Sequence, residues 1–155
     1  MLSKGVVSIV DDDESVCLGT MDLIESMGYV AETYTRAEDF LRSGLLWQMR
    51  CVIADVQMPG MTGLELHEYL VRSGNVIPTI LITAFPKDAD RARALRAGVA
   101  GYLIKPFGDR ELLACIRAVV REPAGTDRRI ETAHCSPHGG FPAWAWTQDR
   151  SESER

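Results

Sequence analysis

The residues best suited to chemistry are acids that directly follow apolar runs. Five acids stand in this position, four of them in one block: Asp11, Asp12, Asp13, Glu14 and Asp55. Two unit charges about 4 Å apart cost on the order of 4 kcal/mol at an effective dielectric constant near 20, so carboxylates that meet need a counter-charge. An all-oxygen site with few protein ligands suits Mg²⁺.

Two further polar residues, Thr83 and Lys105, also follow apolar runs. A hydroxyl offers a hydrogen bond to an anion, and an ammonium group neutralises one carboxylate. One lysine cannot neutralise Asp11, Asp12 and Asp55 together, so we expect a divalent cation beside them. Such a cation also draws a phosphate group into a pocket that is otherwise strongly anionic.

These positions depend on an alternation of strand-like and helix-like segments. The strand-like runs lie at 6–10, 29–33, 51–54, 79–82 and 101–104. The helical patterns lie at 14–27, 36–44, 63–73, 87–97 and 109–121. The alternation predicts an α/β fold, with a parallel sheet, right-handed crossovers and helices on both faces. Ligands of such sheets bind beyond the carboxyl ends of the strands, which is where the polar residues stand.

Part of the acidic block has a simpler interpretation as the start of a helix. Asp13 is a favourable N-cap residue, and Glu14 in the first turn is favoured by the helix dipole. This interpretation accounts for those two residues. It explains neither the two acids that precede them nor Asp55 and Lys105 on other strands.

The bulk properties indicate one globular domain. The chain has 155 residues, a net charge of −5, 46% hydrophobic residues and 25% charged residues. A nucleic-acid partner is not expected, because phosphate backbones require a basic surface. No apolar run approaches the roughly 18 residues that span a bilayer, and the N-terminus lacks the layout of a secretory signal. We therefore expect a cytoplasmic protein that binds neither membrane nor nucleic acid directly.

The cysteines and histidines are expected to stay outside the chemistry. The four cysteines are scattered along the chain: Cys17, Cys51, Cys115 and Cys135. We interpret them as small hydrophobic residues rather than a disulfide framework. His67 is expected at a surface or semi-buried position on its helix, while His134 and His138 have too few neighbouring ligands for a metal site.

The motifs at the strand ends together carry a family resemblance. They are Ile-Val-Asp-Asp at 9–12, Ala-Asp-Val-Gln-Met-Pro-Gly-Met-Thr-Gly at 54–63, Ile-Thr-Ala at 82–84 and Lys-Pro-Phe at 105–107. The segment 6–122 resembles a CheY-like receiver domain of two-component signalling, and the second motif is especially close to the FixJ-type subgroup. The resemblance implies a flavodoxin-like, doubly wound sheet of five parallel strands in the order 2-1-3-4-5, with five helices. We expect a receiver domain at 4–122 and a flexible C-terminal tail at 123–155.

The resemblance also implies a role for each site residue. Asp55 would accept a phosphoryl group from a phosphohistidine donor. Asp12, Asp55 and the backbone carbonyl of Gln57 would coordinate Mg²⁺, and Asp11 would act through a metal-bound water. Lys105 would pair with phosphoryl oxygens. These roles agree with the chemistry, because phosphoryl transfer requires mainly positioning and charge neutralisation.

A conformational switch is implied by the same resemblance. Thr83 would move to hydrogen-bond the phosphoryl group, and Tyr102 would fill the space that it leaves. Without the resemblance, Tyr102 is better interpreted as a half-buried strand aromatic. The bond between Lys105 and Pro106 is expected to be cis, which points the ammonium into the pocket. Phe85 is apolar and cannot orient an attacking water, so we expect a comparatively long-lived phosphorylated form.

The implied partners are a sensor histidine kinase or phosphotransfer protein, and a downstream protein effector. The stretch after residue 122 contains no pattern of a helix-turn-helix effector, which many FixJ-type regulators carry. We therefore expect output through protein contacts, with phosphorylation-linked dimerisation as one form, or a role as a phosphate sink.

Three alternatives stay open. A haloacid-dehalogenase-like phosphatase would use Asp11 as nucleophile and Asp13 as general acid, but it needs a further acidic pair after Lys105 and gives Asp55 no role. A pseudo-receiver would bind partners without phosphorylation, but it requires a degraded site. The chain is also compatible with a receiver fragment of a DNA-binding transcriptional regulator.

Overall fold

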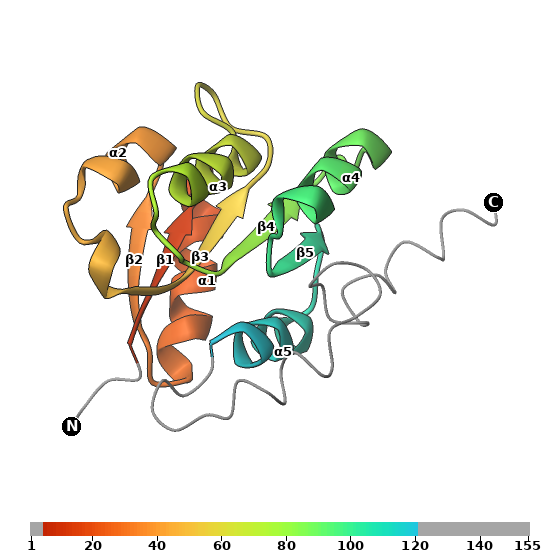
Figure 1. Cartoon of the computed structure of the whole chain (residues 1–155). Coiled ribbons are helices and arrows are strands. Elements are labelled where there is room, and N and C mark those ends of the chain that lie inside the picture. The colour runs from red at the N-terminus through yellow and green to blue at the C-terminus, as the bar shows by residue number, and fades with distance from the viewer. Residues whose placement is uncertain (1–4, 121–155) are drawn as a thin grey trace, which may run out of the picture.

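The computed structural model describes residues 5–120, in which strands and helices alternate (Figure 1). The strands are β1 (Val6–Val10), β2 (Val30–Tyr34), β3 (Met49–Asp55), β4 (Thr79–Thr83) and β5 (Gly101–Ile104). The helices are α1 (Glu14–Ser26), α2 (Ala37–Arg42), α3 (Gly63–Arg72), α4 (Asp88–Ala97) and α5 (Asp109–Val119), with a short 3₁₀ helix at Leu46–Gln48. The predicted alternation is confirmed, and the tail expected at 123–155 lies outside the described residues.

The strands form one sheet in the order β2-β1-β3-β4-β5, and every neighbouring pair is parallel. The doubly wound fold is therefore confirmed. The register sets Val10 beside Ala54 and Asp55 beside Ile82. Because the carboxyl ends of β1, β3 and β4 lie nearly level, the polar residues that end or follow these strands meet at one edge.

The helices cover the two faces of the sheet separately. Leu66 of α3 and Phe40 of α2 are buried in a core on one face, while Ile24 of α1 and Ile116 of α5 are buried in a core on the other. Successive strand residues point to opposite faces, so strand β3 contributes side chains to both cores. Complete burial of one such aliphatic side chain contributes about 1.5–3 kcal/mol.

Local sequence explains where the two helices nearest the site begin. The side chain of Asp13 accepts hydrogen bonds from the backbone N–H groups of Ser15 and Val16, which confirms its interpretation as an N-cap. Helix α3 begins with a capping box, in which the Thr62 side chain accepts from the Glu65 backbone and the Glu65 side chain accepts from the Thr62 backbone. Each cap satisfies N–H groups that a helix start leaves without partners.

Some element bounds differ from the prediction. Strand β3 begins at Met49, two residues before the predicted start, because the 3₁₀ helix brings the chain directly to the sheet and Met49 is buried there. Helix α2 occupies only Ala37–Arg42 of the predicted 36–44. Gly44 follows it with a φ of 73°, a conformation that favours glycine.

The predicted exposure of His67 is wrong. Only 4% of this residue is exposed. Its Nδ1 lies 3.0 Å from the Thr79 hydroxyl and its Nε2 lies 2.8 Å from the Ala97 carbonyl oxygen. Polar groups of β4 and of the end of α4 therefore satisfy both ring nitrogens, which allows the ring to be buried.

The cysteines behave as predicted where they are described. Cys17, Cys51 and Cys115 are buried and free, and burial raises the pKa of the Cys17 thiol to about 11. Cys135, His134 and His138 lie outside the described residues.

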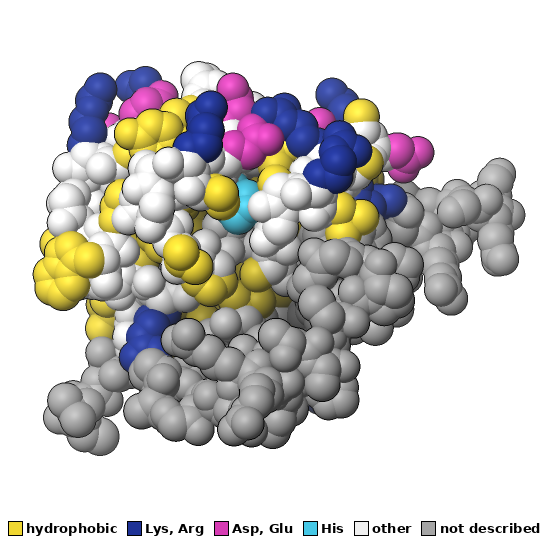
Figure 2. Space-filling view, viewed as in Figure 1, with side chains coloured by type: hydrophobic (Ala, Val, Ile, Leu, Met, Phe, Trp, Pro, Cys, Tyr) yellow, Lys and Arg dark blue, Asp and Glu magenta, His cyan; other side chains and the backbone are white. Residues whose placement is uncertain are grey.

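The surface seen in Figure 2 is divided by type. Charged side chains of both signs gather over α2, α3 and α4, and hydrophobic side chains lie below them on the same face. Two of the most exposed large hydrophobic residues, Trp47 and Val76, precede β3 and β4, so they lie at the sheet end opposite the polar residues. Within residues 5–120, no helix has the length and apolarity required to cross a bilayer.

Candidate functional site

Three carboxylates meet at the carboxyl ends of β1 and β3. Asp11, Asp12 and Asp55 each place a carboxylate oxygen within 4.8 Å of the other two. Asp11 and Asp55 are buried, with 2% and 7% of each residue exposed, and Asp12 is exposed. The three acids that were expected to meet at this sheet edge are thus close together, two of them buried and one exposed.

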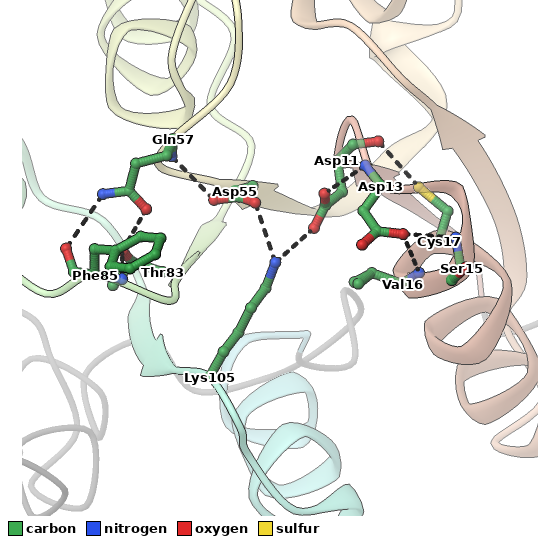
Figure 3. A network of polar contacts seen from close by, with 10 residues as sticks. All are labelled: Asp11, Asp13, Ser15, Val16, Cys17, Asp55, Gln57, Thr83, Phe85 and Lys105. Atoms are coloured by element: carbon green, nitrogen blue, oxygen red, sulfur yellow. Dashed lines mark hydrogen bonds and ion pairs between the residues drawn. The ribbon is translucent and has the colours of Figure 1, made fainter.

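Lys105 reaches into this pocket from the end of β5 (Figure 3). Its Nζ lies 3.1 Å from Asp11 Oδ2 and 3.1 Å from Asp55 Oδ2. The bond between Lys105 and Pro106 is cis, as expected. One ammonium group therefore bridges two carboxylates that come from different strands.

The pKa shifts reflect this crowding. Burial, with a further contribution from the negative charge of Asp55, raises the pKa of the Asp11 carboxyl above its ordinary value. Burial alone would lower the pKa of the Lys105 ammonium, but its hydrogen bonds to Asp55 and Asp11 outweigh burial and raise that pKa. Lys105 is therefore held in its charged form, and the acids still exceed it in number.

The loop after β3 fixes the orientation of Asp55. The backbone N–H of Gln57 donates to Asp55 Oδ1 over 2.9 Å. Gly63, the first residue of α3, packs against the same strand end, and a Cβ atom at this position would lie 2.4 Å from the Asp55 carbonyl oxygen. Helix α3 thus approaches the backbone of Asp55 as closely as a glycine permits.

Thr83 is part of a second polar network beside the carboxylates (Figure 3). Its hydroxyl donates to Gln57 Oε1 over 2.7 Å and accepts from the Phe85 backbone N–H over 3.0 Å. The Gln57 amide also donates to the Phe85 carbonyl oxygen over 3.3 Å. Sequence reasoning assigned only the backbone carbonyl of Gln57 to the site, so it missed the side chain that joins the two loops.

The two aromatic residues near the site differ in burial. Tyr102 is 3% exposed and belongs to the core beneath α3 and α4, so it is more buried than a half-buried strand aromatic. The Arg91 guanidinium of α4 lies 5.8 Å from the centre of its ring. Phe85 is 69% exposed, so most of this residue is accessible to solvent.

The donor set fits a hard divalent cation. Three carboxylates supply oxygen ligands, and one ammonium group leaves an excess of negative charge. Mg²⁺ prefers oxygen ligands and binds through one or two carboxylates, keeping several waters. The pocket therefore combines a possible cation site, a fixed carboxylate, an ammonium group and a hydroxyl, which together suit the transfer of an anionic group.

Comparison with known proteins gives a family match over most of the chain. Residues 7–117 match the family described as Response regulator receiver domain. The chain is 33% identical over 123 residues to the transcriptional regulatory protein FixJ of Azorhizobium caulinodans, which covers 79% of this chain and 58% of that protein. It is 34% identical over 116 residues to the response regulator protein TodT of Pseudomonas putida, which covers 75% of this chain and 51% of that protein. The chain therefore spans little more than half the length of these relatives.

Solved structures share the fold. The response regulator StyR superimposes with a TM-score of 0.69 at 37% identity, covering 83% of this chain and 65% of that one. A CheY-like receiver domain protein from Methanospirillum hungatei superimposes with a TM-score of 0.66 at 27% identity, covering 72% of this chain and 90% of that one. These similarities agree with the parallel sheet and the strand order described above.

Proposed function

The chain belongs to the response regulator receiver domain family, and we propose that its Asp55 accepts a phosphoryl group from a phosphohistidine donor. The observation that carries the proposal is the position of Asp55: its carboxylate is almost buried, accepts from the Gln57 backbone N–H and lies 3.1 Å from the Lys105 ammonium. A carboxylate held in this way is a positioned nucleophile beside a fixed positive charge.

In the proposed step, a carboxylate oxygen of Asp55 attacks phosphorus in line with the bond to the donor histidine. The new P–O bond forms as the P–N bond breaks, and the electron pair of the P–N bond remains on the imidazole nitrogen, which takes a proton from water. Lys105 pairs with phosphoryl oxygens, and Thr83 hydrogen-bonds one of them after transfer. The chain contributes positioning and charge neutralisation, which phosphoryl transfer mainly requires.

We propose Mg²⁺ as the cation of the acidic pocket. Asp12, Asp55 and the backbone carbonyl of Gln57 would hold it directly, and Asp11 would hold it through water. When bound, Mg²⁺ would neutralise charge that builds up on the phosphoryl oxygens. The excess of carboxylates over ammonium groups in the pocket supports this proposal.

Residues 4–122 are proposed as the receiver unit. Receiver domains interact with histidine kinases and effectors, and we propose a histidine kinase or phosphotransfer protein as donor and a protein effector as recipient. Tyr102 is a buried residue of β5, the strand that pairs with β4, which ends in Thr83. We propose that its side chain follows the movement of Thr83. The proposed chemistry is limited to one phosphorylation and a slow hydrolysis, without repeated turnover of phosphate esters.

The test is incubation with acetyl phosphate and Mg²⁺, followed by intact-mass measurement and peptide mapping. We expect one added phosphoryl group on Asp55, no addition to Asp55→Asn, and normal addition to Asp22→Asn, which changes an exposed acid on α1. Modification of Asp11 in place of Asp55, or repeated hydrolysis of phosphate esters, would instead favour the haloacid-dehalogenase-like phosphatase. An unchanged mass with every donor and with a panel of phosphorylated kinases would refute phosphorylation.

A further inference from the structure

We propose that the Gln57 side chain is a latch that holds Thr83 away from a phosphoryl group, so that Gln57 sets how readily the domain reaches its phosphorylated conformation. The proposal rests on the function proposed above and adds a positioning residue to it. Its basis is the hydrogen bond from the Thr83 hydroxyl to Gln57 Oε1, at 2.7 Å the shorter of the two bonds that the hydroxyl makes.

The hydroxyl of Thr83 has one proton to donate. A threonine hydroxyl is a single donor with two acceptor lone pairs. In this structure the proton goes to Gln57 Oε1, and a lone pair accepts from the Phe85 backbone N–H. A phosphoryl oxygen accepts hydrogen bonds but donates none at neutral pH. Thr83 must therefore give up its bond to Gln57 before it can donate to a phosphoryl group.

The latch has a second attachment, which keeps it in place. The Gln57 amide nitrogen donates to the Phe85 carbonyl oxygen over 3.3 Å, so the side chain joins the loop after β3 to the loop after β4. Thr83 is completely buried, which leaves its hydroxyl no solvent partner as an alternative. In the unphosphorylated chain, the hydroxyl proton of Thr83 is thus satisfied by its hydrogen bond to Gln57.

The same residue also contacts the phosphoacceptor. The Gln57 backbone N–H donates to Asp55 Oδ1 over 2.9 Å, while its side chain reaches Thr83. A single residue therefore lies between the group that is modified and the group that must respond (Figure 3). Removing the side-chain bond while keeping the backbone bond would release Thr83 without disturbing Asp55.

Beryllofluoride with Mg²⁺ is a suitable probe, because it mimics a phosphoryl group on a carboxylate. We expect Gln57→Met, which keeps the approximate length of the side chain and replaces its amide acceptor with a weakly accepting thioether, to bind beryllofluoride more tightly than the wild type. The expected gain is about 2- to 12-fold, the range that corresponds to one neutral hydrogen bond. Binding would be followed by NMR titration of the amide signals of Gln57 and Phe85 at fixed Mg²⁺.

A double-mutant cycle separates the latch from a general effect on structure. In a Thr83→Val background there is no hydroxyl to release, so Gln57→Met should give no gain. An equal gain in both backgrounds, or no gain with threonine present, would overturn the latch. If Thr83→Val does not fold, NMR relaxation dispersion on Gln57→Met alone serves instead: a larger minor-state population at Phe85 is expected, and an unchanged population refutes the proposal.

The same experiment distinguishes the latch from the function on which it rests. Asp55→Asn should abolish beryllofluoride binding in both the wild-type and the Gln57→Met backgrounds. If the wild type binds no beryllofluoride, the proposed phosphorylation fails and the latch falls with it. If the wild type binds and Asp55→Asn does not, but Gln57→Met binds as the wild type does, only the latch is refuted.

Discussion

Asp11, Asp12 and Asp55 form an acidic pocket whose charge is only partly balanced by Lys105. Such a pocket weakens the folded state when no cation is present, because like charges close together repel. Active sites often carry this kind of conflict, and binding of the ligand relieves it. Stability of the domain should therefore depend on divalent cations.

Addition of Mg²⁺ is expected to raise the free energy of unfolding of the wild type. A ligand that binds only the folded state contributes about 2.7 kcal/mol at one hundred times its dissociation constant. Asp12→Asn should reduce the gain, because it removes the exposed carboxylate of the set. Urea unfolding with and without Mg²⁺ measures this, with Asp22→Asn as control. A gain that is the same in all three proteins would argue against a cation at this pocket.

Phe85 is expected to influence how fast the phosphorylated form loses its phosphoryl group. Phe85 is 69% exposed, and its ring carries no group that could orient a water molecule. Phe85→Glu would place a carboxylate at the same loop position, and we expect phosphoryl loss to accelerate by up to about 100-fold, the lower limit of the usual range for general acid–base catalysis. Decay of the phosphorylated mass measures the rate, with Phe85→Gln as the uncharged control. Decay as slow as in the wild type would contradict the prediction.

The meeting of Asp11, Asp55 and Lys105 was predictable, because all strands of a parallel sheet have their carboxyl ends at the same edge and the strand runs are visible in the sequence. The partners of the Gln57 side chain were not. They depend on the backbone path of two loops, and Thr83 lies 26 residues away in the chain. Amide groups also accept and donate in many geometries, so residue type alone does not select a partner.

Helices α3 and α4 are joined by two polar contacts of different burial. His67 of α3 lies 2.8 Å from the carbonyl oxygen of Ala97 at the end of α4 and is itself buried. Glu68, the next residue of α3, forms an ion pair with Arg93 of α4, and both side chains are partly exposed. The two contacts allow a direct comparison between a buried and an exposed link.

His67→Leu is expected to lower the free energy of unfolding by about 1–3 kcal/mol, because the Ala97 carbonyl oxygen loses its buried donor. Glu68→Gln, the matched control, should change it by less than about 1 kcal/mol, since exposed ion pairs contribute little. Chemical denaturation of both variants measures the difference. Equal effects would contradict the proposed importance of burial.

The burial of His67 could not be predicted from the sequence, because the hydrogen-bond partners of its ring lie 12 and 30 residues away along the chain.

The whole domain depends on one sheet with a hydrophobic core on each face. Strand β3 contributes residues to both cores, so loss of packing on one face removes support from the other. This level of organisation was the most predictable from sequence. Five apolar runs separated by amphipathic helices leave few topologies once right-handed crossovers are required.

The two cores should therefore unfold together. Leu66→Ala on one face and Ile116→Ala on the other are each expected to cost about 2–5 kcal/mol and to leave a single transition in denaturant. NMR signals of α3, on one face, and of α5, on the other, should give coincident midpoints. Val76→Ala, at a position that is 97% exposed, is the control and should change stability by less than about 0.5 kcal/mol. Separate midpoints for the signals of α3 and α5 would show that the faces unfold independently.

The close contact between Gly63 and the Asp55 backbone restricts which residues can occupy position 63. A single hydrogen atom fills the space between the first turn of α3 and the carbonyl oxygen of Asp55, so every other side chain would have to push the two apart. The position has no tolerated substitute unless the strand end itself shifts. Conversely, a shift of that strand end would displace the first turn of α3, which packs against it. The NMR chemical shifts of the amide groups in this turn should therefore change when the pocket is occupied, although these groups lie outside it.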